Sequence, residues 1–303
     1  MAIGLHLLRS SPEETPSGSN VSMKVDTITE PFTSIHAEVE GADLEILPSK
    51  DGTCNVTSPA TEKVYYTATA EDGVLMIWKT DLRKWYERFT LFSFQSPTVK
   101  VSLPEAEYEK LTVQSYSTDV TVASGVSFDR AEIKATSGEI KYLGDATSEL
   151  NLSATSGSVF VQGVSAVEID GKVTSGRIEM EDISCYRLNA KSTSGSIKIK
   201  NATVDETCHL EQTSGSISLS RVISHGNLSA KLTSGGLRLD KCDAATLSLK
   251  TTSGSIRGSL CSDKVFNVKV TSGSVHVPNS VPNGDLCEIE TTSGSVNLTI
   301  EKD

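Results

Sequence analysis

The tripeptide Thr-Ser-Gly recurs nine times between residues 136 and 294, at spacings of 19 to 21 residues. A degenerate tenth copy, Ser117-Thr118-Asp119, ends nineteen residues before the first motif glycine. Similarity at a fixed period indicates a repeat protein, in which each copy is one structural unit that packs on its neighbours. The motif glycines are Gly138, Gly157, Gly176, Gly195, Gly215, Gly235, Gly254, Gly273 and Gly294.

Each copy contains two short segments in which apolar and polar residues alternate. The position five residues before the glycine and the positions two and four residues after it are mostly apolar. Alternation with a period of two predicts half-buried strands. The position two residues after the glycine is aliphatic in every copy, and we expect it to form one buried, stacked column: Ile140, Val159, Ile178, Ile197, Ile217, Leu237, Ile256, Val275 and Val296.

The chain must bend at each motif, because the apolar positions on its two sides are an odd number of residues apart and a straight strand would point them to opposite faces. Glycine permits the backbone angles of such a corner, and Ser and Thr hydroxyls can satisfy backbone groups that the bend leaves unpaired. Two five-residue strands cannot bury their own apolar face, so the copies must stack. The sequence therefore predicts an all-β fold, a single-chain parallel β-solenoid (β-helix) of about ten 19–20-residue rungs with an N-terminal β cap.

Three regions are expected along the chain. Residues 1–30 are rich in Ser, Pro and Glu and are predicted to be a polar tether or linker. Residues 31–112 contain alternating segments without the regular spacing, and we interpret them as an N-terminal cap and divergent early rungs, because the end of a solenoid exposes strand edges that need cover. Residues 113–303 are the regular repeat solenoid. No run of 18 apolar residues occurs, so no transmembrane helix is expected.

The nine Thr-Ser-Gly copies with their alternating aliphatic residues, together with the preceding segments Val101-Ser102-Leu103-Pro104 and residues 108–113, resemble a bacterial family of proposed adhesins. Members of that family contain a domain of unknown function with a β-solenoid fold. The resemblance implies an extracytoplasmic, cell-envelope location, often through an N-terminal membrane segment; this chain shows at most residues 3–8 as a remnant of one. The family supplies no catalytic residues and no cofactor.

Lysine fills six of the nine positions four residues before the motif glycine, although the chain has 28 Lys+Arg against 39 Asp+Glu and a net charge of -11. A second basic column, three residues after the glycine, holds Lys141, Lys198, Arg238, Arg257 and His276. Such columns could bind an anionic polymer, or they could form a solvated face that resists aggregation. The candidate binding lysines are Lys172, Lys191, Lys231 and Lys250.

Half of the aromatic residues, including both tryptophans, lie within residues 65–94. Exposed aromatic rings beside arginines suit sugar rings or a protein partner, whereas a cap would use the same rings to cover the first rung. Both interpretations stay open. The candidate binding residues of this segment are Arg83, Trp85, Tyr86 and Arg88.

No catalytic, metal-binding or cofactor-binding residues are predicted. Nine equivalent hydroxyls indicate a structural role, because a catalytic serine needs one positioned base. The five histidines lack metal-ligand spacing, and the six cysteines are expected to be free thiols, with a Cys242–Cys261 disulfide as the alternative. The excess of acidic residues argues against a nucleic-acid partner.

The sequence therefore favours a non-catalytic cell-envelope surface protein that binds a glycan, an anionic cell-wall polymer or a protein partner. One alternative is a polysaccharide lyase or hydrolase, since long β-helices often carry such sites. The other is a self-assembling structural rod, which would require the final strand, Val296–Ile300, to be free at the end of the stack.

Overall fold

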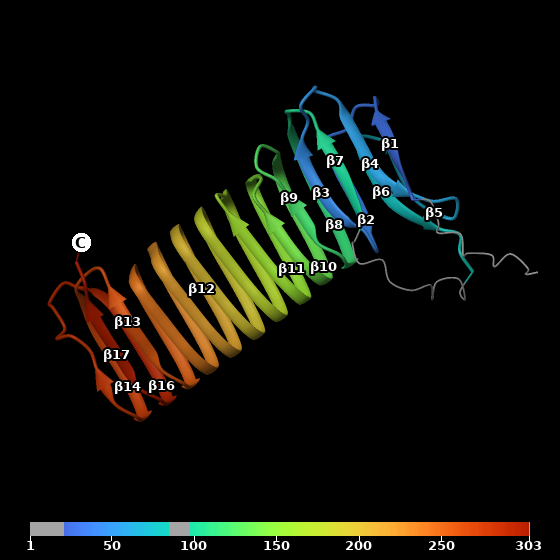
Figure 1. Ribbon diagram of the computed structural model, residues 1–303. Coiled ribbons are helices and arrows are strands. Elements are labelled where there is room, and N and C mark those ends of the chain that lie inside the picture. The colour runs from blue at the N-terminus through green and yellow to red at the C-terminus, as the bar shows by residue number, and fades with distance from the viewer. Residues whose placement is uncertain (1–20, 85–96, 303) are drawn as a thin grey trace, which may run out of the picture.

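A computed structural model describes residues 21–84 and 97–302, and every regular element within these ranges is a β-strand. The strands build an elongated, β-solenoid-like body (Figure 1). In chain order they are β1 (Ser22–Ile28), β2 (Ser34–Val39), β3 (Asp43–Pro48), β4 (Cys54–Ala60), β5 (Val64–Glu71), β6 (Val74–Asp81), β7 (Thr98–Leu103), β8 (Glu107–Ser117), β9 (Val120–Val122), β10 (Ser127–Tyr142), β11 (Asp145–Gln162), β12 (Ser165–Ser253), β13 (Ile256–Leu260), β14 (Lys264–Ser272), β15 (Val275–His276), β16 (Asp285–Ser293) and β17 (Val296–Ile300). Nowhere in the described part of the chain does a helix reach the length and hydrophobicity needed to span a bilayer.

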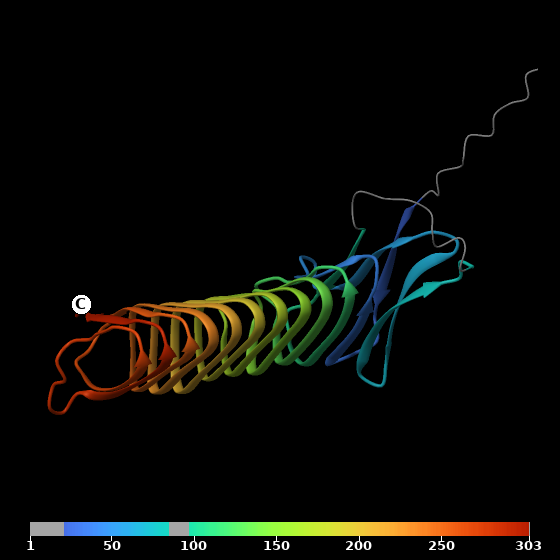
Figure 2. The ribbon, with the colours of Figure 1, turned by 90° about the horizontal axis from the view of Figure 1, so that it is seen from below.

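The repeats stack in parallel and in register. Strand β10 pairs with β11, and β11 with the first part of β12, so that Gly138 lies opposite Gly157 and Gly157 opposite Gly176. The strand β12 continues through several motifs without interruption, and the chain coils around the long axis of the body (Figure 2). The degenerate copy joins the same stack, because Val120 pairs with Ile140.

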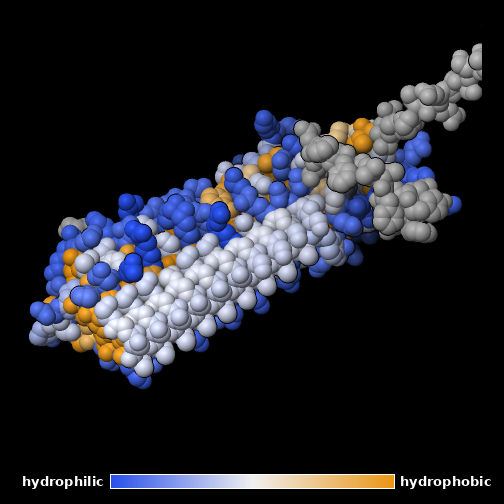
Figure 3. Space-filling view, turned by 60° about the horizontal axis from the view of Figure 1, so that its bottom comes forward, coloured by the Kyte–Doolittle hydropathy of each residue, from blue (hydrophilic) through white to orange (hydrophobic). Residues whose placement is uncertain are grey.

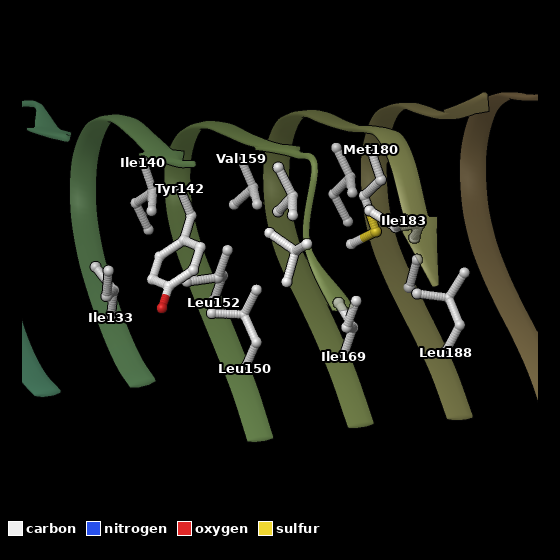
Figure 4. Close-up of a cluster of buried hydrophobic side chains, with 14 of the residues drawn as sticks. Ile133, Ile140, Tyr142, Leu150, Leu152, Val159, Ile169, Met180, Ile183 and Leu188 are labelled. Carbon is white, nitrogen blue, oxygen red and sulfur yellow. The ribbon is translucent and has the colours of Figure 1, made fainter. Parts of the chain in front are cut away.

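The aliphatic side chains of the motif point into a continuous interior (Figure 4). Eight of the nine residues that stand two positions after a motif glycine are buried, which agrees with the prediction for this column. The prediction is wrong for Val275, which is 42% exposed. Val275 belongs to the outermost C-terminal rung, so no further rung covers it.

Glycine is required at the motif corner by a close approach between rungs. Eight of the nine motif glycines have φ between +108° and +156°, a region that other residues rarely adopt. From Gly157 onward, a Cβ atom built on each motif glycine would lie 1.6–2.0 Å from the carbonyl oxygen of the glycine on a neighbouring rung. The glycines therefore form a column that has no room for a side chain.

A second corner lies six residues after the motif glycine. Gly163 has a φ of 71° there, and Asp182, Asn201, Arg221 and Lys241 have φ between 48° and 54°. Side chains at this corner form hydrogen bonds between successive rungs: the Asn201 amide donates to Asp182 at 2.8 Å, and Arg221 donates to Asn201 at 3.3 Å. Gly, Asp and Asn tolerate left-handed backbone angles, whereas Arg221 and Lys241 adopt them although their residue types give no such indication, so the sequence analysis did not predict this corner.

At the N-terminal end, the order of the rungs in space differs from their order in the chain. The pair β2–β3 lies between β6–β7 on one side and β8–β9 on the other. Antiparallel strands then cover the end, with β5 on β6, β4 on β7 and β1 on β4. Strand β1 lies within the segment expected to be a polar tether, where it pairs antiparallel with β4 and leaves Met23 and Val25 exposed.

The C-terminal end is interleaved in the same way. The last segment, β16–β17, lies between β12–β13 and β14–β15. The strand Val296–Ile300 is therefore not the free end of the stack. The expectation that this strand would be available for end-to-end assembly is wrong. After β13, the chain forms the outermost rung first, starting at Lys264. The following segment, starting at Asp285, then lies between that rung and the end of β12.

A buried lysine holds the three C-terminal levels together. Lys264 has no exposed side-chain surface, and its Nζ lies 2.5 Å from Asp243 Oδ1 and 3.3 Å from Asp285 Oδ2. It also donates to the carbonyl oxygen of Ala244 at 2.8 Å. A buried ammonium group needs such partners, because an unpaired buried charge is very costly.

All six cysteines are free thiols. A register shift places Leu260, and not Cys261, opposite Cys242. Burial raises the pKa of Cys54 and Cys242 to about 11 and that of Cys185 and Cys287 to about 12. The thiols therefore serve as small apolar side chains in the core.

Replacing a motif glycine should destabilise the stack strongly. In Gly195→Ala the new Cβ would lie 1.8 Å from the Gly176 carbonyl oxygen, and we expect a loss of about 3 kcal/mol in the free energy of unfolding, measured by urea denaturation. The control is Gly236→Ala, where the nearest atom is 3.9 Å away and a change within about 0.5 kcal/mol is expected. Equal stability of the two variants would contradict the steric argument.

Removal of the buried ammonium group should loosen the C-terminal rungs. Lys264→Met leaves Asp243 without its cation, and we expect amide hydrogen exchange to accelerate in residues 246–300 while the central rungs keep their protection. Lys269→Met is the matched control, because the Lys269 side chain is 79% exposed and its ion pair with Glu290 is long, at 3.7 Å. Unchanged exchange in Lys264→Met would show that the ion pairs do not hold this end.

The folded protein should resist thiol reagents. The raised pKa values keep the buried thiols protonated at pH 8, and the thiolate is the reactive species. With a chromogenic disulfide reagent, only Cys261, which is half-buried, should react rapidly, and all six cysteines should react in urea. Rapid reaction of several thiols in the native state would mean that the core opens.

Candidate binding face

The outward side chains four and two residues before each motif glycine form what we call the lysine–threonine face. The alternation of the strand sets this face, because the residues between these positions point into the core. The nine threonines are all exposed, as are the six lysines. Figure 3 shows the adjoining Thr-Ser-Gly edge as a long pale strip, bordered on both sides by hydrophilic side chains.

The lysine column contains acids that separate its charges. Lys191 lies 2.7 Å from Glu211 on the next rung, and hydrogen bonding to Lys191 lowers the pKa of that carboxyl group. Because the last rung is interleaved, Glu290 lies between Lys250 and Lys269, at 3.6 and 3.7 Å from their ammonium groups. The column is therefore a series of mixed charges at its C-terminal end, not an unbroken basic stripe.

Two of the four candidate lysines differ from the others. Among residues 21–84 and 97–302, no carboxylate forms an ion pair with Lys172 or Lys231, whereas Lys191 and Lys250 are paired. Asp170, two residues before Lys172, is partly buried, and its burial together with the nearby Glu168 raises its pKa. Lys172 and Lys231 are therefore the two candidate lysines without an ion pair among the described residues, and Lys172 still attracts the Asp170 carboxylate and acts against the rise of its pKa.

An open depression of about 400 Å³ crosses the N-terminal half of this face. It runs over β8, β10, β11 and β12. Its lining is mostly polar and consists of Gln114, Ser115, Tyr116, Lys134, Ala135, Thr136, Ser153, Ala154, Thr155, Lys172 and Thr174. Each rung contributes the same positions, so the lining repeats at the strand spacing of about 4.8 Å. Such a surface suits an extended polymer better than a compact molecule.

The second basic column also divides into paired and unpaired residues. Lys198 forms an ion pair with Glu179, and Lys141 lies 5.8 Å from the centre of the Phe160 ring. Arg238 and Arg257 are exposed, lie opposite each other on adjacent rungs and have no ion pair within the part of the chain that is described.

The predicted aromatic site falls largely outside the described residues, since Trp85, Tyr86 and Arg88 lie between residues 84 and 97. Arg83 is described, and its guanidinium binds Asp81, with Nη2 at 2.8 Å from Oδ2. The prediction for Trp85, Tyr86 and Arg88 therefore stays a prediction.

Two exposed aromatic residues were missed as site candidates. Trp78 on β6 is 36% exposed and Tyr116 on β8 is 50% exposed. Alignment of the degenerate copy on Asp119 places Ser117, not Tyr116, in the threonine column. The strands pair one residue away from that alignment, with Ser115 opposite Ala135 and Ser117 opposite Ser137, so Tyr116 reaches the threonine column only in the structure. Trp78 had been assigned only to a strand and to the aromatic segment.

The geometry offers little for catalysis or metal binding. Within the described ranges, no group of three His, Cys, Asp or Glu side chains is placed to hold a metal ion. The repeated hydroxyls lie in equivalent columns along the body, and none of them is paired with a single positioned base.

The sequence profile of a family described as Toastrack DUF4097 matches residues 32–226 and 222–303. No curated protein matches the sequence. Among solved structures, a proposed lipid-binding protein from Parabacteroides distasonis is 15% identical with a TM-score of 0.44, over 92% of this chain and 97% of that one. A proposed adhesin from Bacteroides fragilis is 11% identical with a TM-score of 0.34, over 93% of this chain and 98% of that one. These scores are too low to support an argument about ligands.

Proposed function

Since the chain belongs to the Toastrack DUF4097 family, whose function is unknown, we propose from its own surface that it is a non-catalytic cell-envelope protein that binds an anionic polymer along the lysine–threonine face. The family match confirms the resemblance that the Thr-Ser-Gly copies predicted. We further propose that this face is built on a parallel β-solenoid of about ten rungs. The boundaries between the N-terminal tether, the cap with its early rungs and the regular repeats are proposed at residues 30 and 112, as expected from the sequence.

The observation that carries the proposal is the exposed, regularly spaced lining of the depression on this face. Lys134 and Lys172 stand on either side of Ser153, at equivalent positions of three successive strands. Lys134 forms an ion pair with Glu132 at 2.5 Å, so Lys172 is the lysine of this lining without an ion pair in the described part of the chain. A polymer with regularly spaced phosphate or carboxylate groups, such as an acidic glycan, can contact several such rungs at once. Regular spacing also makes weak single contacts add up, as in multivalent binding.

The enzyme alternative receives less support. A lyase or hydrolase needs clustered carboxylates, or a positioned Lys or Arg base, in a groove. The described residues that line the depression include lysines and hydroxyl groups but no carboxylate.

End-to-end assembly is also less supported. The outermost strand β14 is partly covered by residues 278–284, because Val281 N donates to Lys264 O at 3.2 Å and Phe266 N donates to Ser280 Oγ at 2.9 Å. Covered strand edges resist pairing with another chain.

Binding to an anionic polymer should depend on the unpaired lysines. We expect polygalacturonate to bind the protein at low salt and to dissociate as salt rises, because exposed charges are screened beyond about 8 Å at physiological ionic strength. The double variant Lys172→Gln/Lys231→Gln should weaken binding about tenfold, measured by calorimetry.

The matched control is Lys191→Gln/Lys250→Gln, which removes the same charge from two lysines that are already paired with Glu211 and Glu290. We expect a smaller loss of affinity in this variant. The proposal fails if the wild-type protein ignores both polygalacturonate and polyglycerol phosphate at low salt, or if the two double variants bind equally.

A further inference from the structure

A second depression lies at the N-terminal end of the same sheet, on the outer side of β6, β2 and β8. It has a volume of about 310 Å³, and we call it the aromatic groove. The side chains that define it are His36, Glu38, Glu40, Trp78, Lys79 and Tyr116.

The two aromatic rings stand on opposite sides of the groove. Strand β2 lies between β6, which carries Trp78, and β8, which carries Tyr116, since Ala37 pairs with both Ile77 and Val113. Two strand spacings separate the outer strands, which is about 10 Å. The rings therefore flank a gap of roughly the width of one sugar residue, with β2 as its floor.

These rings are not part of the packing of the cap. Other aromatic residues at this end pack on one another and are buried or half-buried: Tyr108 stacks on the half-buried Phe32 at 5.7 Å and lies 5.6 Å from the buried Phe128. Trp78 and Tyr116 are exposed, and neither has a ring partner within the described ranges. A large exposed aromatic side chain without a packing role indicates a contact surface.

The groove is lined by two carboxylates, those of Glu38 and Glu40, and by one ammonium group, that of Lys79. Glu38 and Glu40 are exposed there, and His36 Nε2 lies 3.4 Å from Glu38 Oε1. The backbone carbonyl of Glu40 accepts a hydrogen bond from the Tyr66 hydroxyl at 2.8 Å, which fixes this part of the floor. Carboxylates accept hydrogen bonds from hydroxyl groups and repel anions, so the groove does not suit the polyanion of the lysine–threonine face.

Aromatic faces beside carboxylate acceptors match the chemistry of a pyranose ring. Its C–H face packs on an aromatic ring, and its hydroxyls donate to carboxylates. The groove is also continuous with its neighbours. It shares His36 and Met76 with a depression of about 410 Å³ over Lys110 and Thr112, and it shares Tyr116 with the depression on the lysine–threonine face. The joined surface has room for a chain of sugars.

We propose that the aromatic groove binds a neutral pyranose glycan, with Trp78 and Tyr116 as stacking residues and Glu38 as an acceptor for sugar hydroxyls. This site goes beyond the proposed polyanion binding, because it uses other residues and a ligand of different charge. The two proposals can therefore fail separately.

Tryptophan fluorescence provides a direct test. The chain has two tryptophans, so Trp85→Phe leaves Trp78 as the only one. In this background, titration with cellohexaose, chitohexaose and mannohexaose should change the emission of Trp78 for at least one of the three. Tyr116→Ala should weaken that binding about tenfold, and Tyr116→Phe, which keeps the ring, should retain most of it.

Calorimetry extends the test to Trp78→Ala, which should also lose about tenfold in affinity. The matched control is Tyr186→Ala, since Tyr186 is 46% exposed but lies on β12, away from the groove. Each variant should melt at the wild-type temperature, because none of the three rings is buried.

Three results would overturn the proposal. They are no binding of any of the three oligosaccharides, binding that is unaffected by Trp78→Ala and Tyr116→Ala, and binding that Lys172→Gln/Lys231→Gln abolishes instead. If the neutral oligosaccharides bind through the groove while polygalacturonate does not bind at all, this proposal stands and the polyanion proposal fails.

Discussion

The contact between glycines on neighbouring rungs is the constraint on which the rest of the structure depends. From Gly157 onward, each motif glycine approaches the carbonyl oxygen of the glycine on a neighbouring rung so closely that no Cβ fits between them. This fixes the register of one rung on the other, and the register in turn aligns every other position of the repeat into a column. A buried column, an outward lysine column and an exposed threonine column therefore follow from one steric requirement at the corner.

The sequence was sufficient to predict these columns, because the alternation and the motif are properties of a single repeat. Ile140, Val159 and Ile178 are buried as their pattern indicated. The order of the end rungs could not be predicted in this way. A repeat specifies which face stacks but not which neighbour it stacks on, so nothing in the spacing placed Glu290 between Lys250 and Lys269.

The candidate sites show the same limit. The lysines were found because they occupy a repeated position, whereas Trp78 lies in a segment without a repeat, where alternation predicts a strand but not its outer face. Tyr116 lies in the threonine column only because the degenerate copy pairs one residue away from its sequence alignment on Asp119, and the spacing of the motif does not show this shift. The ion pairs could not be predicted from a single repeat either, because they form between side chains of different rungs. Arg187 lies 3.1 Å from Glu168 and 3.4 Å from Glu206, residues that are nineteen positions away on either side. Pairs of this kind relieve repulsion within the columns, and they leave only a few charges, such as Lys172 and Arg257, available to a ligand.

The interleaved ends have a consequence for how the length of this protein can change during evolution. A repeat appended after residue 300 would emerge from the inner level of the C-terminal stack, where β13 and β15 already occupy both sides of β17. The same holds at the other end, where β2–β3 is enclosed by later strands. Duplication or loss of a whole copy is therefore compatible with the fold in the interior, where successive copies are stacked in chain order, whereas a copy added at either end would have to enter between levels that are already paired.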